Sequence, residues 1–305
     1  MKTMKTVLLT GATGYIGQFT IRALLERQFI IHAVTSKSIK SKSSENIIWH
    51  QTNLLDFAEK DDLIKNIRPT HLLHFAWYVE HGKFWNAIEN IDWLQGSLNL
   101  ARQFVKNGGK RLVISGTCAE YDWTKKSPFS ESETPLSPQT LYGAAKTSLA
   151  LTLEKFAQAN NFSFASGKIF FPFGANESPN RLIPSVIRAL LKNELAETSH
   201  GNQIRDFLYV EDIAEAFVKL LESDVRGAVN IASGSGIKLK EIIKMIGEII
   251  GKPELLRIGA IPASADEPLE IIADITRLSE EVKFRKKYDL RKSLEESVKF
   301  WKESL

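Results

Sequence analysis

The 305-residue sequence predicts an α/β protein with a doubly wound parallel sheet and a smaller, partly interleaved α/β domain. Short apolar segments of β type alternate with longer segments of helical period, which is typical of a parallel sheet with helices on both faces. After Phe173-Gly174 the alternation breaks and the strands become shorter. A chain of this length corresponds to about two domains of roughly 150 residues each, so a second domain is expected.

Five strands and four helices are predicted before Gly174. The strands are Val7–Leu9, Ile30–Val34, Leu72–Ala76, Arg111–Ser115 and Phe162–Phe171. The helices are Gln18–Arg27, Asp61–Ile67, Ile88–Val105 and a segment from Ser137-Pro138 to Ala159. Ser137 suits the cap of the last helix and Pro138 its first turn. The polar residues 36–45 are predicted to form an exposed loop.

The rest of the chain predicts a more mixed arrangement. In order, it contains helix Ile183–Leu191, strand Arg205–Val210, helix Asp212–Glu222, strand Val229–Ile231, helix Leu239–Ile250 and helix Leu290–Trp301. We expect these elements to be shared between the first domain and a smaller second one.

Composition excludes several classes of protein. The net charge of +4 is too small to indicate a nucleic-acid partner. The single cysteine, Cys118, excludes an internal disulfide and any multi-cysteine zinc site, and fits a reducing compartment. No apolar run approaches the ~20 residues of a membrane span, and the histidines lack metal-ligand spacing. We therefore expect a soluble, cytoplasmic protein with no membrane, nucleic-acid or metal partner.

A glycine-rich loop, Thr10-Gly11-Ala12-Thr13-Gly14-Tyr15-Ile16-Gly17, joins the first strand to the first helix. Glycines in such a loop allow a tight turn, a close approach of the backbone to a pyrophosphate and close packing of helix on sheet. A plain structural turn is the alternative. At the first strand-to-helix junction of an α/β chain, the pattern predicts a dinucleotide site.

The end of the second strand bears on which dinucleotide binds. An acidic residue there would bond the adenosine ribose 2′-hydroxyl and repel a 2′-phosphate. This chain instead has Thr35-Ser36-Lys37, followed by Lys40 and Lys42, with no carboxylate before Glu45. Two hydroxyls and an ammonium suit a phosphate, so NADP(H) is preferred and NAD(H) is the alternative. A solvated lysine loop would explain the same residues without any ligand.

A tyrosine four residues before a lysine on a helix places both side chains on one face. The ammonium then lowers the pKa of the phenol, which suits proton transfer to or from a substrate oxygen. Three pairs have this spacing: Tyr121-Lys125, Tyr142-Lys146 and Tyr288-Lys292. Only Tyr142 lies in the first turns of a well-capped helix of the nucleotide-binding half. We therefore predict that Tyr142 and Lys146 are the functional pair.

Four motifs in order carry a resemblance to a known family. They are Thr10–Gly17, Ser115-Gly116-Thr117-Cys118-Ala119-Glu120-Tyr121, Tyr142-Gly143-Ala144-Ala145-Lys146 and Arg205-Asp206-Phe207-Leu208-Tyr209-Val210-Glu211-Asp212. Together they resemble the extended short-chain dehydrogenase/reductases, in particular the NAD(P)-dependent epimerase/dehydratase branch that acts on nucleotide sugars. The resemblance implies a Rossmann-type dinucleotide-binding domain, residues 1–174 plus about 204–235. It also implies a substrate domain, about 175–203 plus 236–305.

The resemblance assigns roles to individual residues. Thr117 would hydrogen-bond the sugar oxygen, Tyr142 would donate or accept the proton, and Lys146 would hold the nicotinamide ribose and keep Tyr142 acidic. The cofactor-binding residues would be Gly11, Thr13, Gly14, Tyr15, Ile16, Gly17, Thr35, Ser36, Lys37, Asn53, Leu54, Phe75, Ala76, Trp77 and Lys146. The substrate residues would be Thr117, Tyr142, Phe171, Arg181 and Arg205, with Arg205 on the diphosphate. A helix cap or a surface ion pair is the alternative for Arg205.

Departures from the family pattern bear on the reaction. Cys118 and Ala119 stand where the dehydratases have an Asp-Glu acid/base pair, so 4,6-dehydration is not expected. Cys118 is expected to be a small buried residue rather than a nucleophile. Phe171 and Arg181 replace two asparagines of the sugar-nucleotide pocket, Lys168 replaces an arginine and Trp93 an asparagine.

Two further features have alternative interpretations. The aromatic residues Trp77, Tyr78, Phe84 and Trp85 either line a sugar or base site or anchor a loop into the core. His74, within an apolar strand, is expected to be a hydrogen-bonded core residue rather than a catalyst.

The leading functional hypothesis is an NADPH-dependent 4-ketoreductase of an NDP-4-keto-6-deoxyhexose, serving deoxysugar biosynthesis. The alternative is an NAD-dependent nucleotide-sugar 4-epimerase, and a remote one is a non-catalytic dinucleotide-binding scaffold or sensor. Chemistry at C3 instead of C4 stays open. The resemblance also implies a homodimer formed through helices Ile88–Val105 and Gln139–Ala159.

Overall fold

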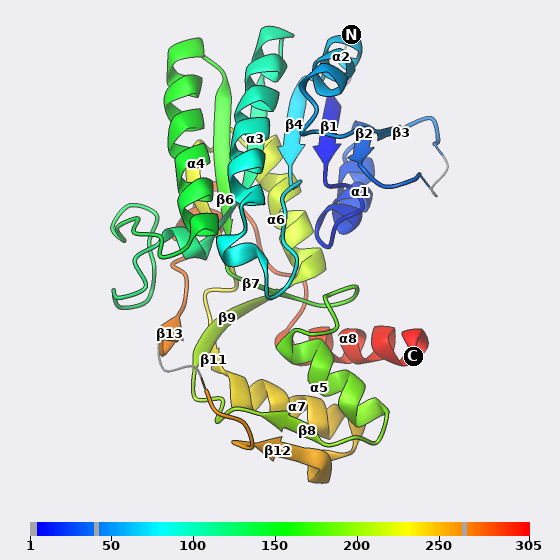
Figure 1. Ribbon diagram of the computed structural model, residues 1–305, viewed down its shortest axis with the longest axis vertical. Helices are drawn as coiled ribbons and strands as arrows, with labels where there is room; N and C mark the ends of the chain where they lie inside the picture. Colours follow the sequence, from blue (N-terminus) through cyan, green and yellow to red (C-terminus); the bar gives the residue numbers. More distant parts are fainter. Residues whose placement is uncertain (1–4, 40–42, 264–266) are drawn as a thin grey trace.

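Apolar strands build a seven-stranded sheet in which every neighbouring pair is parallel (Figure 1). The computed structural model describes residues 5–39, 43–263 and 267–305. In spatial order, the strands are β10 (Gly227–Ile231), β6 (Ser163–Ile169), β5 (Arg111–Thr117), β4 (His71–His74), β1 (Thr6–Thr10), β2 (Ile30–Thr35) and β3 (Ile47–Gln51). Strands β1 and β4 are neighbours but not consecutive, so the order reverses between them. The predicted doubly wound parallel sheet is confirmed.

Helices cover both faces of this sheet, as the continuous apolar strands require. One face packs against α2 (Phe57–Ile67), α3 (Glu89–Lys106) and α4 (Leu141–Asn160). The other face packs against α1 (Gly17–Glu26) and α6 (Val210–Glu222). Alternate residues of β1 serve the two faces, Leu8 on the first and Val7 and Leu9 on the second.

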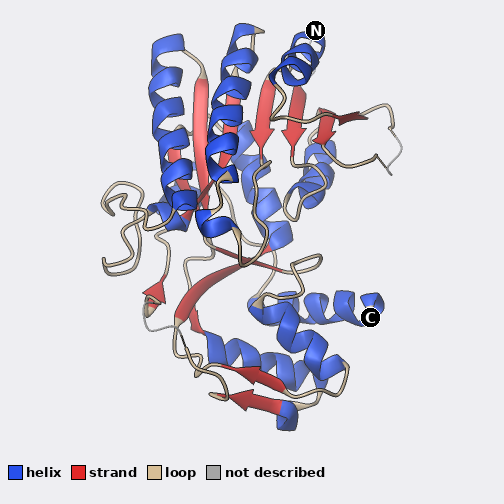
Figure 2. Cartoon of the chain, in the orientation of Figure 1, coloured by secondary structure: helices blue, strands red, loops and turns tan. Residues whose placement is uncertain are grey.

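A second group of elements lies beyond the carboxyl end of the large sheet (Figure 2). A small sheet contains β7 (Phe171–Phe173), β9 (Ile204–Tyr209), β11 (Gly236–Lys238) and β13 (Glu270–Ile271), and a separate pair contains β8 (Ala196–Thr198) and β12 (Leu256–Ile258). Helices α5 (Leu182–Leu191), α7 (Leu239–Ile250) and α8 (Leu290–Ser304) share a core of their own. The short helical turns are η1 (Phe84–Asn86), η2 (Cys118–Glu120), η3 (Pro253–Leu255) and η4 (Arg277–Glu281).

The chain passes back and forth between the two groups. Strand β7 already belongs to the small sheet, α5 and β9 follow there, and α6 and β10 return to the large sheet. The predicted division into 1–174 plus 204–235 and the remaining segments stays a prediction, with β9 as the part of 204–235 that pairs within the small sheet. No helix in the described ranges is long and apolar enough to cross a lipid bilayer.

Several elements differ from the expectation, and three of the differences have a clear physical cause or position. Helix α4 begins at Leu141 because Thr140, not Ser137, is its cap; the Thr140 hydroxyl accepts the Gly143 N–H at 3.1 Å. The strand expected over 162–171 is two strands, since the chain leaves the large sheet after Ile169 and enters the small one at Phe171. Strand β3, a half-buried edge strand with a polar end, was not predicted.

Candidate active site

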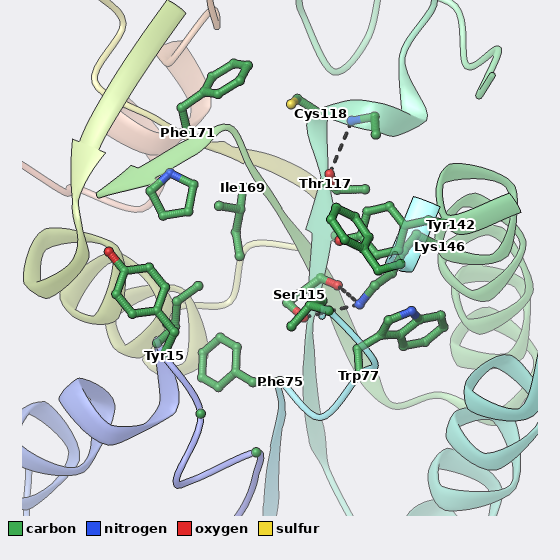
Figure 3. Close-up of a pocket in the computed structure, with 18 of the residues that line it drawn as sticks. Tyr15, Phe75, Trp77, Ser115, Thr117, Cys118, Tyr142, Lys146, Ile169 and Phe171 are labelled. Carbon is green, nitrogen blue, oxygen red and sulfur yellow. Dashed lines mark hydrogen bonds between the residues drawn. The ribbon is translucent and has the colours of Figure 1, made fainter. Parts of the chain in front are cut away.

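A cavity of about 350 Å³ opens at the carboxyl ends of β1, β4, β5 and β6, beside the point where the strand order reverses (Figure 3). This is where ligands bind in open α/β sheets. Residues predicted from the sequence that line it are Gly11, Gly14, Tyr15, Ile16, Gly17, Phe75, Ala76, Trp77, Thr117, Tyr142, Lys146, Phe171 and Arg181. Predicted residues that do not line it are Thr13, Thr35, Ser36, Lys37, Asn53, Leu54 and Arg205.

The glycine loop is packed so closely that Gly11 and Gly17 have no room for a side chain. Gly11 has a φ of +67°, and a Cβ there would lie 2.8 Å from the Ala76 nitrogen. A Cβ on Gly17 would lie 2.1 Å from the Gly11 carbonyl oxygen. The loop is therefore folded tightly at the N-terminus of α1, and its geometry fits the pyrophosphate of a dinucleotide.

The residues predicted for the adenosine end surround the end of β2, outside the cavity. The buried Thr35 hydroxyl lies 3.0 Å from the Thr13 hydroxyl and accepts the Lys37 N–H at 3.1 Å. Ser36, Lys37 and Asn53 are exposed, whereas Leu54 is buried. Lys40 and Lys42 lie outside the described residues.

Thr117, Tyr142 and Lys146 converge on one wall of the cavity (Figure 3). Thr117 ends β5, and its hydroxyl accepts the Ala119 N–H at 3.2 Å. Tyr142 lies in the first turn of α4 and packs edge-on against Phe84, with 4.9 Å between ring centroids. The cluster combines a hydroxyl, a phenol and an amine, which is a proton-transfer set.

Lys146 is held against the sheet by its neighbours. Its Nζ donates to the Ser115 carbonyl oxygen at 2.9 Å and lies 4.0 Å from the centroid of the Trp77 ring. Burial lowers the pKa of Lys146 to about 7, although the Glu120 carboxylate acts in the opposite direction. Near pH 7, Lys146 is therefore a mixture of the ammonium and the neutral amine.

The pKa of Tyr142 differs from the expectation based on spacing. Burial raises it above its ordinary value of 10.0, while a hydrogen bond with Thr117 acts in the opposite direction. Lys146 Nζ lies 6.0 Å from the Tyr142 ring centroid, too far to offset the burial. Because burial dominates, the expectation that the ammonium keeps Tyr142 acidic is wrong for this arrangement of groups.

The two competing tyrosines point elsewhere. The Tyr121 hydroxyl donates to Asn230 Oδ1 at 2.7 Å in the core, and the Tyr288 hydroxyl donates to Glu211 Oε2 at 3.1 Å. Neither lines this cavity. Position, rather than spacing, separates Tyr142 from the others.

Arg205 lies behind the cavity wall. Its Nη2 donates to Glu267 Oε1 at 2.7 Å, and its guanidinium carbon lies 5.5 Å from the centroid of the Phe171 ring. Glu267 and the carbonyl of Ile204 already use part of its donors. A role for Arg205 on a diphosphate therefore stays a prediction, whereas Arg181 reaches the cavity directly.

Cys118 and His74 have the surroundings expected of structural residues. Burial raises the pKa of the Cys118 thiol to about 12, so it is not a thiolate near neutral pH. The two ring nitrogens of His74 lie 2.7 Å from the Thr10 hydroxyl and 2.8 Å from the Ser97 hydroxyl. Burial lowers the pKa of His74 to about 3, which keeps the ring neutral.

Sequence reasoning missed Glu177, which lines the cavity beside Arg181. Arg181 Nε lies 3.2 Å from Glu177 Oε1, while the buried Oε2 has no hydrogen-bond partner among the residues that the structure describes. Burial raises the pKa of Glu177 from 4.5 to about 7. No spacing rule marks this residue, because the fold of the loop before α5 creates its environment.

Glu177→Gln is expected to stabilise the protein at pH 8 but not at pH 5. The folded-state pKa lies above the unfolded one, so the unfolded chain releases the proton first and stability falls between about pH 4.5 and 7. A shift of this size corresponds to at most about 3 kcal/mol at pH 8. Thermal unfolding at both pH values measures it, with the exposed Glu133→Gln as the control. An equal effect at both pH values would contradict the interpretation.

Within the described residues, no cluster of three or more His, Cys, Asp or Glu side chains is arranged to hold a metal ion. The polar groups that line the cavity include Thr117, Tyr142, Lys146 and Glu177.

Comparison with known proteins connects this geometry to a family. Residues 7–232 match the NAD dependent epimerase/dehydratase family. A UDP-glucose 4-epimerase of Bacillus subtilis is 28% identical, with 81% of this chain and 82% of that protein covered. The structure of a UDP-N-acetylglucosamine 4-epimerase from Methanobrevibacter ruminantium, in complex with UDP-N-acetylmuramic acid, superimposes with a TM-score of 0.87, 24% identity and 100% of both chains covered.

A Thermus thermophilus UDP-glucose 4-epimerase in complex with NAD superimposes with a TM-score of 0.84 and 21% identity, covering 98% of this chain and 100% of that one. The family match spans both the glycine loop and the Thr117–Tyr142–Lys146 cluster. The chain therefore belongs to the NAD-dependent epimerase/dehydratase family, and it is an NAD(P)-dependent enzyme of the extended short-chain dehydrogenase type.

Proposed function

We propose that the protein is a nucleotide-sugar 4-epimerase. The observation that carries this proposal is the convergence of Thr117, Tyr142 and Lys146 on the cavity that the glycine loop also lines. The curated relatives, including the Bacillus subtilis protein, support epimerisation more than the 4-ketoreduction expected from the sequence. The 4-ketoreductase hypothesis is therefore the second candidate rather than the first.

The proposed mechanism assigns the proton to Tyr142 Oη. A bound nicotinamide would accept hydride from the sugar carbon and return it. Tyr142 takes the proton of the C4 hydroxyl as the carbon is oxidised and gives it back when the carbon is reduced on the opposite face. The Thr117 hydroxyl, hydrogen-bonded to Tyr142, orients the same oxygen. Lys146 would hold the ribose of the dinucleotide.

The side chains that line the cavity suit a sugar ring that must rotate within the site. Phe84, Trp85, Trp123, Phe170 and Phe171 line the cavity, and the Trp123 indole N–H already donates to the Cys118 carbonyl at 2.8 Å. Apolar walls exclude water and impose few directional contacts on the ring. An epimerase needs such freedom, because both faces of the ketone must be presented to one nicotinamide.

The 4-ketoreductase of an NDP-4-keto-6-deoxyhexose remains a candidate for two reasons. Cys118, Ala119 and Phe171 offer few hydrogen bonds, which suits a deoxygenated sugar. In addition, no carboxylate follows Thr35 at Ser36 or Lys37, so nothing there repels the 2′-phosphate of NADPH. NADP(H) preference is accordingly part of this second candidate, although the Thermus thermophilus relative was crystallised with NAD.

Two assays separate the candidates. The protein is incubated with UDP-linked hexoses and product composition is followed, and it is incubated with NADPH and dTDP-, GDP- and CDP-linked 4-keto-6-deoxyhexoses while absorbance at 340 nm is recorded. Interconversion without net cofactor change supports the epimerase. Stoichiometric NADPH oxidation supports the reductase, and a binding titration with NADP and NAD tests the cofactor preference directly. If the protein shows neither activity, that result would argue for a non-catalytic role.

We further propose a homodimer formed through α3 and α4. Ile91 and Leu151 on these helices are exposed large apolar side chains, as is Ile88 just before α3. Multi-angle light scattering is expected to give about twice the chain mass of 34.3 kDa. Leu151→Glu, which places a charge on this surface, is expected to shift the protein toward the monomer, whereas a wild type that is monomeric at micromolar concentration would contradict the proposal.

A further inference from the structure

A buried ion pair lies behind Thr117. Glu120, which is fully buried, binds Lys168, which is 3% exposed. Neither side chain lines the active cavity, so any effect on the reaction must be transmitted through other residues. Breaking such a pair by removing one partner is costly, because it leaves a buried charge uncompensated.

The Glu120 carboxylate bridges two elements. Its Oε1 accepts the Thr117 backbone N–H at 2.8 Å, and its Oε2 accepts from the Lys168 ammonium. In turn, the Thr117 hydroxyl accepts the Ala119 N–H. The Glu120–Thr117 contact and this one form a capping box at the start of η2. The backbone of Thr117 is therefore held from both sides, and the direction of its hydroxyl follows from that backbone.

Two features of the sheet make room for the pair. Lys168 of β6 is the register partner of Gly116 of β5, which places it directly beside the residue before Thr117. A Cβ on Gly116 would lie 2.7 Å from Glu120 Oε1 and 2.7 Å from the Ser166 hydroxyl. Glycine at this position thus leaves the space that the carboxylate occupies.

We propose that the Glu120–Lys168 ion pair positions Thr117 for the reaction and balances the charge next to Tyr142. The inference rests on the proposed function of Thr117 and Tyr142 but concerns two residues outside the cavity. Glu120 and Lys168 act as positioning residues, since each works through Thr117 or through the electrostatic field rather than through substrate contact.

The charges that face Tyr142 come from three elements. Glu120 and Cys118 on η2 raise the pKa of Tyr142, Arg181 before α5 lowers it, and Lys146 lies one turn away on α4 itself. Lys168 compensates the charge of Glu120 through its contact with Oε2. Removing Lys168 alone therefore exposes Tyr142 to an unbalanced carboxylate, and removing the Glu120 charge alone exposes it to an unbalanced ammonium.

Opposite shifts from the two single variants are the signature of this role. In the dinucleotide-saturated enzyme, Lys168→Met is expected to raise the titration midpoint of Tyr142 by roughly half to one pH unit. Glu120→Gln is expected to lower it, and the double variant to return it near the wild-type value. Tyrosine labelled with ¹³C at Cζ reports the midpoint by NMR, and Tyr142→Phe assigns the signal by removing it.

The kinetic readout follows from positioning. Lys168→Met is expected to lower kcat about 10-fold or more with little change in KM, because a misplaced Thr117 affects the reacting geometry more than binding. The limb of the pH–rate profile that belongs to Tyr142 should move to higher pH. Lys168→Arg, which keeps the cation, is expected to restore kcat to within about threefold of wild type.

Controls keep the test decisive. Lys5→Met makes the same chemical change at the exposed Lys5–Glu222 pair and is expected to leave the midpoint and kcat unchanged. If Lys168→Met does not fold, Glu120→Gln and the double variant carry the comparison. A lowered melting temperature with unchanged midpoints and kcat in the variants would overturn the proposal. A wild type inactive on every nucleotide sugar would refute the proposed function, yet the Tyr142 titration would still test the pair.

Discussion

Tyr142→Phe is expected to reduce turnover by about 10²- to 10⁴-fold while leaving dinucleotide binding within about twofold of wild type. The ring remains packed against Phe84 and Trp85, at centroid distances of 4.9 and 5.9 Å, so the wall of the cavity keeps its shape. Only the hydroxyl that moves the proton is lost, and removing a general acid–base group costs this much. Steady-state kcat and a fluorescence titration with the dinucleotide measure the two effects.

The matched control is Tyr121→Phe. It makes the same chemical change in another Tyr-x-x-x-Lys pair, but its hydroxyl donates to Asn230 in the core at 2.7 Å and lies outside the cavity. We expect kcat within about threefold of wild type and a lower melting temperature, because the buried Asn230 loses a partner. Turnover of Tyr142→Phe close to wild type would remove Tyr142 from the mechanism.

The choice of Tyr142 could be made from the sequence because it depends on local order along the chain. The large sheet places the glycine loop after β1 and the Ser115–Thr117 segment at the end of β5 at the same edge, and parallel strands bring such ends together. Tyr142 then needs only a helix that follows β5 and packs on that face. These are properties of connectivity, which periodicity and glycine positions reveal.

Electrostatic balance could not be predicted in the same way. Spacing places Lys146 one turn from Tyr142, yet burial governs both groups, lowering the pKa of Lys146 and raising that of Tyr142. Desolvation depends on how Trp77, Phe84 and the β5 backbone enclose the two side chains, and these contacts join segments far apart in sequence. A one-dimensional pattern contains no measure of such enclosure.

The same limit explains Glu177 and Arg205. Glu177 follows Gly174 in a loop with no regular period, and only the folded loop turns its carboxyl into the cavity beside Arg181. Arg205 carries a recognisable motif, but its partner Glu267 comes from a segment 62 residues later. A motif identifies which residue type stands at the end of an element. Tertiary packing decides which partner the side chain of that residue binds.

Gly17→Ala is expected to weaken dinucleotide binding by roughly 5- to 100-fold and to lower the melting temperature. The added methyl would lie 2.1 Å from the Gly11 carbonyl oxygen and 2.9 Å from its carbon. Both are backbone atoms, so no rotamer change relieves the overlap and the loop must open. Overpacking costs roughly 1–3 kcal/mol, and each ~1.4 kcal/mol corresponds to tenfold in affinity. A fluorescence titration with the dinucleotide measures the loss.

Gly96→Ala separates this effect from the general consequences of placing alanine in a helix. Gly96 lies in α3, and its added methyl would meet the flexible end of Leu55 at 3.0 Å, where a side-chain movement can relieve the contact. We expect dinucleotide affinity close to wild type for this variant, since α3 does not contribute to the glycine loop. Equal loss of affinity in both variants would mean that the Gly17 effect reflects global destabilisation, whereas loss confined to Gly17→Ala locates the pyrophosphate contact at the turn from β1 into α1.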